Sequence, residues 1–364
     1  MTVKQITNIL EELAPLSYAE DFDNVGLLVG NENTEVSGVL VTLDTLENVV
    51  DEAIAKKCNL IISFHPIIFN GLKKITGATY VERVVMNAIQ NNISIYSMHT
   101  ALDNSPYGVN AKICEVLGVF NTKVLIPQKK TIKKLTTYVP NNKAEELKES
   151  LFAAGAGTIG NYSNCSFSID GTGTYRPGED SNPTIGKIGE LHYEQETQIN
   201  ITYNKTVESK VLRALFDYHP YEEIAYEVLS LENTNEHIGM GMVGELKQPM
   251  SESDFLEMLK TKFNAKGIRH SALLGKKIRK VAVLGGSGAF AIAAAKNVNA
   301  DIFISADIKY HQFYEAEKKI IVADIGHYET EQFTKNLLVD YLTKKIPNFA
   351  ISLSESITNP IKYY

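Results

Sequence analysis

The chain has 364 residues, of which 44% are hydrophobic and 22% charged, and its formal net charge is −7. This composition is that of an ordinary globular protein, and it excludes disorder along most of the chain. The acidic balance disfavours a protein that binds nucleic acid, and no apolar run approaches the roughly 18–20 residues that span a bilayer, so no membrane partner is expected.

The first 128 residues alternate between helical and strand-like patterns. Apolar residues at helical spacing predict helices, and short buried-type runs predict strands. The predicted helices are Val3 to Leu13, Leu46 to Lys57 and Tyr80 to Gln90, and the predicted strands are Gly38 to Leu43, Leu60 to Phe64 and Ile93 to Met98. This alternation is typical of a mainly parallel sheet with helices on both faces.

The pattern changes near Gln128 and predicts a second kind of structure up to about Leu231. The predicted order is strand, helix, strand, strand, helix, strand, which is the split β-α-β-β-α-β arrangement, ferredoxin-like in topology. The strands are Leu135 to Val139, Cys165 to Ile169, Ile199 to Tyr203 and Ile224 to Leu229, and the helices are Ala144 to Ala154 and Glu208 to Tyr218. A stretch rich in Gly, Pro and Asp, Gly171 to Pro183, predicts a long loop between the middle strands.

The alternating pattern then returns. It predicts the helices Phe255 to Phe263, Ala289 to Val298 and Glu329 to Lys344, and the strands Val281 to Leu284, Ile302 to Ser305, Ile320 to Asp324 and Ala350 to Leu353. The simplest account is an α/β fold in which one domain is built from both chain ends, residues 1–128 and 246–364. A smaller α+β domain, residues 129–245, is inserted in it.

Three polar clusters follow predicted strands, at the carboxyl end of each. They are Ser63 to Pro66, His99 to Asp103 and Asp324 to Glu331. Ligands of open α/β sheets bind at this edge, so distant segments can converge there. The clusters are therefore candidates for one site.

The spacing within the third cluster indicates metal chemistry. His327 and Glu331 lie four positions apart, which places both on one face of a helix. Together they would make half of a metal site, and His65 and Asp103 would supply the other half. His, Asp and Glu ligands without thiolates suit zinc, manganese or iron, and carboxylates can bridge two ions roughly 3.5–4 Å apart.

Simpler explanations exist for each cluster taken alone. His65 before a proline is typical of a turn, His99 and Asp103 would cap a helix, and His327 with Glu331 would form a solvated ion pair. The occurrence of three of the chain's 8 histidines after predicted strands favours the site. The run Gly285 to Gly288 either presents N–H groups to an anion or forms a tight turn with a helix cap, and the turn is modestly favoured.

The cysteines point away from thiolate chemistry and from an oxidising compartment. Cys58, Cys114 and Cys165 are odd in number and widely spaced. The N-terminus shows no basic start, apolar block and cleavage site of a secretory signal. A cytoplasmic protein without a disulfide framework is expected.

Six motifs, in order along essentially the whole chain, resemble one known family. It is the NIF-three-like family, also called dinuclear-metal-centre hexameric proteins and labelled GTP cyclohydrolase I type 2 homologs. The motifs are Asp23 to Leu27, Phe64 to Phe69, Tyr96 to Asp103, Gly285 to Gly288, Ser305 to His311 and Asp324 to Glu331. The middle domain, with His219 to Glu223, resembles the PII/CutA-like insert of the longer members.

The resemblance implies a site and an activity. It assigns the metal ligands His65, Asp103, His327 and Glu331, for one or two divalent ions (Zn, Mn or Fe) per subunit. The family usually has two consecutive histidines before the proline. Here the first is Phe64, which cannot ligate a metal, so the second metal position is weak, empty or completed by another group.

The resemblance also places two further histidines near the site. His99 and His311 match family positions there, and they are expected to act in proton transfer or behind the ligands. The family further implies a homohexamer and a hydrolase in which a metal-activated hydroxide attacks a nucleotide-like substrate, GTP in the family label. The alternative is a non-catalytic hexameric scaffold that binds metal and senses a ligand through its insert.

Overall fold

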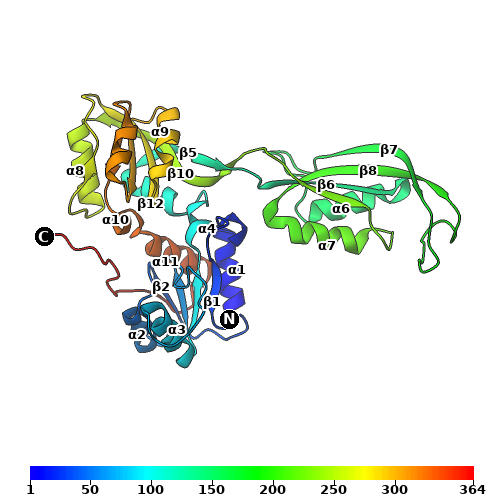
Figure 1. Cartoon of the computed structure of the whole chain (residues 1–364), viewed down its shortest axis with the longest axis horizontal. Coiled ribbons are helices and arrows are strands. Elements are labelled where there is room, and N and C mark those ends of the chain that lie inside the picture. Colours follow the sequence, from blue (N-terminus) through cyan, green and yellow to red (C-terminus); the bar gives the residue numbers. More distant parts are fainter. The chain divides into compact units, whose positions relative to one another are not determined.

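The structure, a computed structural model, describes residues 1–364 (Figure 1). It divides the chain into two compact units, one made of Met1–Pro127 with Glu236–Tyr364 and the other of Gln128–Asn235. The protein is a mixed α/β fold with several sheets. None of its helices is both long enough and apolar enough to cross a membrane.

The first unit contains a five-stranded sheet of order β1-β4-β3-β2-β15. Strands β4, β3, β2 and β15 are parallel, and β1 pairs antiparallel at the edge. The strands are β1 (Gly26–Val29), β2 (Val39–Thr42), β3 (Leu60–Ser63), β4 (Ser94–Ser97) and β15 (Ile351–Leu353). Helices α2 (Glu47–Ala55) and α3 (Tyr80–Gln90) pack on one face in a core of their own.

A second sheet of six strands, order β11-β14-β13-β12-β10-β5, lies in the same unit. Its centre is parallel and its flanking pairs β10–β12 and β11–β14 are antiparallel. The strands are β5 (Val119–Gln128), β10 (Asn235–Met250), β11 (Arg269–His270), β12 (Ile278–Ser287), β13 (Ile302–Ala306) and β14 (Ile321–Asp324). The short helix α9 (Ile292–Asn297) packs against its outer core.

One continuous core joins the two sheets. Val39 and Val41 of β2 belong to the same buried cluster as Val281 and Val283 of β12. The helices in this cluster are α1 (Val3–Leu13), α5 (Val109–Leu117), α8 (Glu252–Lys262) and α11 (Thr334–Lys345). The sequence indicated a mainly parallel sheet, whereas the unit has two sheets. A strand buried on both faces has the same sequence pattern in either sheet, so the pattern does not tell which strands pair.

One predicted helix near the polar clusters has the wrong boundaries. The predicted helix Glu329 to Lys344 is two helices, α10 (His327–Glu331) and α11, separated at Gln332. The Gln332 side chain donates to the carbonyls of Phe263 and Glu329 at this break. The other short helix at a strand end is α4 (His99–Asp103).

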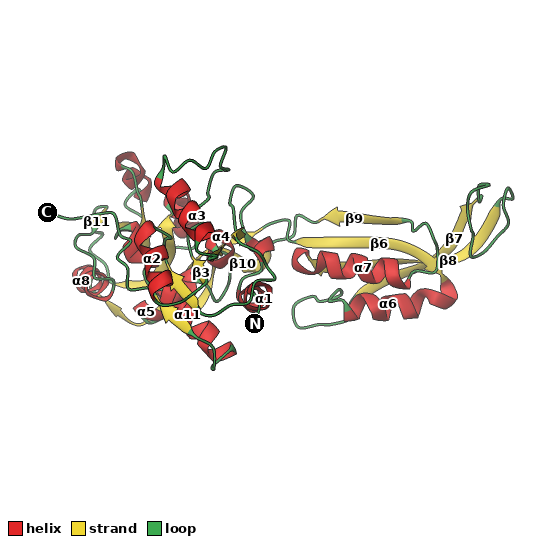
Figure 2. Cartoon of the chain, turned by 90° about the horizontal axis from the view of Figure 1, so that it is seen from below, coloured by secondary structure: helices red, strands yellow, loops and turns green.

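The second unit is an antiparallel sheet with helices on one side (Figure 2). Its strand order is β7-β8-β6-β9, and its core includes Leu135, Leu147, Ile199 and Leu215. The elements are β6 (Ile132–Pro140), α6 (Ala144–Ala153), β7 (Ser166–Tyr175), β8 (His192–Asn204), α7 (Glu208–Tyr218) and β9 (Tyr226–Ser230). Their order along the chain is the predicted one.

The long loop of this unit begins later than predicted. Residues 171–175 belong to β7, and the loop is 176–191. A glycine is needed at position 173 of this strand, because a Cβ there would lie 2.0 Å from Oε2 of Glu196 on the neighbouring strand. A glycine that admits a neighbouring side chain has the same sequence signature as a loop glycine, which explains the error.

A single carboxylate on α2 holds the segment after β15. Glu52 accepts hydrogen bonds from the Ser354 hydroxyl (2.7 Å) and from the backbone N–H of Glu355 (2.9 Å) and Ser356 (3.0 Å). Burial alone would raise the pKa of Glu52, but Lys56 and these donors lower it to about 2. A carboxyl whose pKa is lower in the folded state stabilises the fold above its unfolded pKa, and that contribution disappears as the pH falls from about 4.5 to 2.

We therefore expect Glu52→Gln to lower the free energy of unfolding by about 1–2 kcal/mol at pH 7, after allowance for solvent screening. The difference from the native chain should shrink as the pH approaches 3. Urea unfolding at both pH values measures it. Glu47→Gln, which removes an exposed partner of Arg83, is the control and should change little. An equal loss at both pH values would contradict the assignment.

Candidate metal centre

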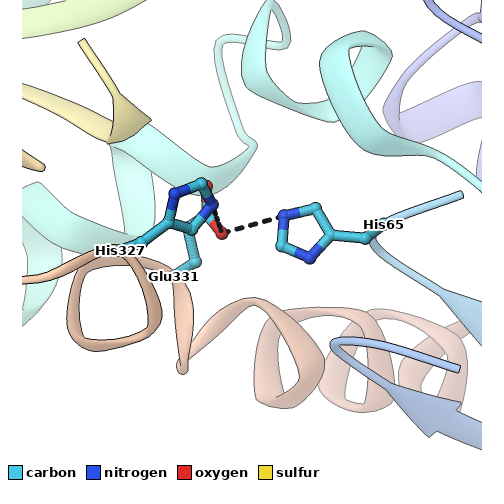
Figure 3. A group of neighbouring side chains, drawn as sticks. All are labelled: His65, His327 and Glu331. Carbon is cyan, nitrogen blue, oxygen red and sulfur yellow. Dashed lines mark ion pairs between the residues drawn. The ribbon is translucent and has the colours of Figure 1, made fainter. Parts of the chain in front are cut away.

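Three donor atoms from two sheets meet at one point (Figure 3). His65 follows β3, whereas His327 and Glu331 lie on α10 after β14. Their ligand atoms lie within 4.8 Å of one another. Oε2 of Glu331 is 3.1 Å from Nε2 of His65 and 3.1 Å from Nε2 of His327. The sequence predicted all three residues as ligands, and the structure brings them together.

The geometry around Glu331 fits a metal ion. Its Oε2 atom is buried and is the shared neighbour of the Nε2 atoms of both imidazoles, with no further partner. Two donor atoms bound at about 2.0–2.1 Å to one ion lie roughly 3 Å apart, as these do. Two imidazoles and a carboxylate are a donor set that zinc, iron or manganese accepts. The residues present therefore fit a divalent metal.

The protonation of these residues reflects the same convergence. Burial opposes the charge on Glu331, yet the two imidazoles lower its pKa to about 2. Burial likewise opposes the charge on His65, but Asp44 and Glu331 raise its pKa to about 10. Glu331 and then Asp307 raise the pKa of His327 to about 9 against the effect of burial. Protons and a metal ion thus compete for the same imidazole nitrogens.

A carboxylate orients each histidine of the region through its Nδ1 atom. Nδ1 of His65 lies 2.8 Å from Asp44, and Nδ1 of His327 lies 2.7 Å from Asp307. A hydrogen bond at Nδ1 fixes the ring and leaves Nε2 free for a metal, which is the usual arrangement behind histidine ligands. The sequence analysis missed both carboxylates as partners. They follow β2 and β13, so the strand-end rule that found His65 was the signal that could have found them.

His99 lies beside the donors with its own carboxylate. Its Nδ1 atom is 2.8 Å from Asp23, whose other oxygen accepts from the N–H of Thr100 (3.0 Å). The ring centroid of His99 is 5.3 Å from that of His65. Phe64, which is fully buried, packs against both rings at centroid distances of 4.9 and 5.5 Å. An apolar ring therefore occupies one side of the centre.

Asp103 lies at the end of α4, outside the set of three converging donors. Its Oδ1 atom is buried without a hydrogen-bond partner. Burial, followed by the nearby charge of Glu331, raises the pKa of Asp103 well above its usual value, while His65 and His327 act in the opposite direction. A buried carboxylate oxygen with no partner is the kind of group that a cation would satisfy.

His311 is not brought to these donors. It is exposed on the short helical segment Tyr310–Ala316, and its ring contacts are with Tyr310 (5.1 Å) and Tyr314 (6.2 Å). It makes no hydrogen bond, ion pair or ring contact with His65, His327 or Glu331.

The glycine run at the end of β12 makes room for Glu331. A Cβ at Gly286 would lie 2.3 Å from Oε1 of Glu331, and the residue has φ +68°. The N–H of Gly286 donates to Thr330 (2.9 Å), and the N–H of Gly285 donates to Asn110 (3.0 Å). Both N–H groups are used within the protein, so they are not available to an anion. The glycines of this run let the backbone pass close to Glu331 of the candidate metal centre.

Gly286→Ala should therefore weaken metal binding. The new methyl group would push Glu331 from its position, and displacement of a supporting group typically costs about tenfold to a hundredfold in metal affinity. Titration of the metal-free protein with zinc measures the change. Gly267→Ala is the matched control, because a Cβ there would meet nothing within 4 Å. Equal zinc affinity in the two variants would contradict the role of Gly286.

Comparisons with known proteins agree on one family over the whole chain. The sequence pattern of the Duf34/NIF3 (NGG1p interacting factor 3) family matches residues 1–360. A "GTP cyclohydrolase 1 type 2 homolog" of Bacillus subtilis is 36% identical over 370 residues, covering 99% of this chain and 98% of the relative.

Two solved structures are similar in fold along the full length. The crystal structure of a Bacillus cereus protein related to NIF3 has a TM-score of 0.81 at 37% identity and covers 100% of this chain and 99% of its own. A Staphylococcus aureus protein has a TM-score of 0.77 at 30% identity, with the same coverage. The resemblance seen in the six sequence motifs is thereby confirmed, and the chain belongs to the Duf34/NIF3 family.

Proposed function

We propose that the protein is a metal-dependent hydrolase that acts on a small nucleotide-like substrate. The observation that carries the proposal is the convergence of Glu331 Oε2 with Nε2 of His65 and His327, 3.1 Å from each. The name of the Bacillus subtilis relative, "GTP cyclohydrolase 1 type 2 homolog", supports a purine nucleotide as the first substrate to test.

The roles of the chain's own residues follow from their positions. His65, His327 and Glu331 would hold the ion, with Asp103 as a further ligand. When bound, a divalent ion lowers the pKa of a water molecule on it toward about 7 and makes that water a nucleophile at neutral pH. We assign proton transfer to His99, because its ring lies 5.3 Å from that of His65 and Asp23 orients it. His311, predicted alongside it, has no comparable contact.

Turnover tests this proposal directly. Purified protein given GTP with manganese, iron or zinc should release formate, and Glu331→Ala should reduce the rate by at least about a hundredfold, since the variant loses a ligand of the ion. Glu257→Ala removes an exposed carboxylate on α8 and should leave the rate unchanged. Absence of turnover with all three metals, or an unchanged rate in Glu331→Ala, counts against hydrolysis.

We further propose that one ion, not two, binds to each chain. Phe64 is fully buried and packs against both His65 and His99. An apolar ring therefore occupies the space beside these two histidines. A benzene ring offers no lone pair to a hard or borderline cation. A second ion would depend on Asp103 and His99 without a donor at position 64.

Elemental analysis of the protein after loading with zinc should therefore give about one ion per chain. Phe64→His restores a nitrogen donor at that position and should raise the ratio toward two. Phe64→Leu, which keeps an apolar side chain, is the control and should stay near one. Two ions in the native chain would show that Phe64 does not limit the site.

The alternative is a non-catalytic, cytoplasmic, hexameric scaffold whose insert resembles PII/CutA proteins and senses a ligand. The β-α-β-β-α-β order of the second unit and its separate core support an insert with a task of its own. Metal binding that persists without formate release would favour this function over hydrolysis. Native mass measurement tests the hexamer.

A further inference from the structure

The second unit contains a cavity of about 500 Å³, far in the chain from every residue of the metal centre. It lies between the end of β7, the loop 176–191 and the turn that follows α7. Its volume is in the range of small-molecule sites. Nothing in the proposed hydrolysis uses it.

The walls of this cavity are tied to one another. The Thr184 hydroxyl donates to the carbonyl of Pro220 (2.8 Å), and the N–H of Asn182 donates to Glu222 (2.8 Å). The Tyr175 hydroxyl donates to the carbonyl of Ile185 (2.9 Å). The loop is therefore fastened to both the strand and the turn. A cavity formed in advance does not lose binding energy to loop ordering.

Aromatic rings line the cavity. Tyr138, Tyr175 and Tyr221 all face it, and the rings of Tyr175 and Tyr221 have centroids 6.0 Å apart. The ring of His219 packs against that of Tyr221 at a centroid distance of 5.3 Å. Its Nε2 atom donates to the Tyr138 carbonyl (3.0 Å), and its Nδ1 atom accepts from the Tyr221 N–H (3.2 Å). These contacts fix the rings in place.

A carboxylate lies among these rings. Glu196 Oε1 accepts from the Tyr221 hydroxyl at 2.8 Å, and the absence of a side chain at Gly173 leaves the space that Oε2 occupies. Oε2 takes part in none of the hydrogen bonds of the structure. The lining carries three carboxylates, Glu196, Glu222 and Glu223, against the guanidinium of Arg176, so its net charge is negative. Such a surface attracts cations.

The chemistry favours an organic cation over a metal ion. A hard metal ion needs several carboxylate or carbonyl oxygens directed at one point. The carboxylates of this lining are not among the converging ligand groups of the structure, and Glu196 lies beside the hydroxyl of Tyr221. Aromatic faces beside a carboxylate are instead the recognised environment of ammonium groups, which gain from the ring quadrupole and from the ion pair together. We propose that this cavity binds a small organic ammonium ion, held against the rings of Tyr175 and Tyr221 beside Glu196.

Calorimetric titration of the full chain with choline, tetramethylammonium and butylammonium tests the proposal. The neutral isostere of choline, 3,3-dimethylbutan-1-ol, and the zwitterion glycine betaine are the comparison ligands. We expect at least one of the three ammonium ions to bind about tenfold more tightly than either comparison ligand. Absence of binding by all three at millimolar concentration overturns the proposal. Equal binding of the neutral isostere, or tighter binding of betaine through Arg176, overturns it as well.

Variants locate the site. Glu196→Gln should weaken ammonium binding about tenfold while far-UV circular dichroism stays unchanged, and Tyr221→Phe, which keeps the ring but releases Glu196, should have a smaller effect in the same direction. Glu194→Gln is the matched control, because Glu194 lies on the same strand but pairs with His192 (2.9 Å) and does not line the cavity. Equal weakening in Glu194→Gln would contradict the assignment. Zinc content should be the same in all three variants, which separates this test from that of the hydrolase.

Discussion

The centre of the first unit depends on the burial of one carboxylate. Glu331 is 3% exposed, and an ionised group at that depth is costly unless a cation compensates it. Compensation comes from His327 on the same helix and from His65 at the end of a strand in the other sheet. Because these donors belong to different sheets, the two sheets must keep their relation for the charge to be satisfied. The core shared by β2 and β12 supplies that relation.

Small and apolar residues around this carboxylate shape the site together with the polar ones. Gly286 allows the backbone of β12 to approach Glu331, and its φ of +68° is one that glycine adopts without strain. Phe64 packs its ring against those of His65 and His99. The carboxylates Asp44 and Asp307 fix the ring orientations from behind. The result is a site in which three donor atoms face one point and the two histidine rings are held by carboxylates at Nδ1.

The sequence predicted the converging donors because their signal is local. His327 and Glu331 are four positions apart on a helix, and His65 follows a strand, so a rule about strand ends was sufficient. To predict the partners Asp44 and Asp307, one must know which strand ends are neighbours. The sequence does not give this order, because buried strands have the same sequence pattern in either sheet. His311, which resemblance alone suggested, is exposed, and its ring contacts are with Tyr310 and Tyr314. Its role stays a prediction.

Each unit contains a buried or half-buried carboxylate, but the groups beside the two carboxylates differ. This difference determines which kind of cation suits each site. Glu331 is compensated by nitrogen donors that can give up protons, so a metal ion can replace those protons at little cost in geometry. Glu196 accepts from the Tyr221 hydroxyl in a cavity lined by aromatic rings. A tyrosine hydroxyl does not exchange its proton for a metal near neutral pH. A cation that keeps its own charge and brings an apolar body suits the second environment. Both sites contain a carboxylate, so we expect the groups beside it to decide which cation each site binds.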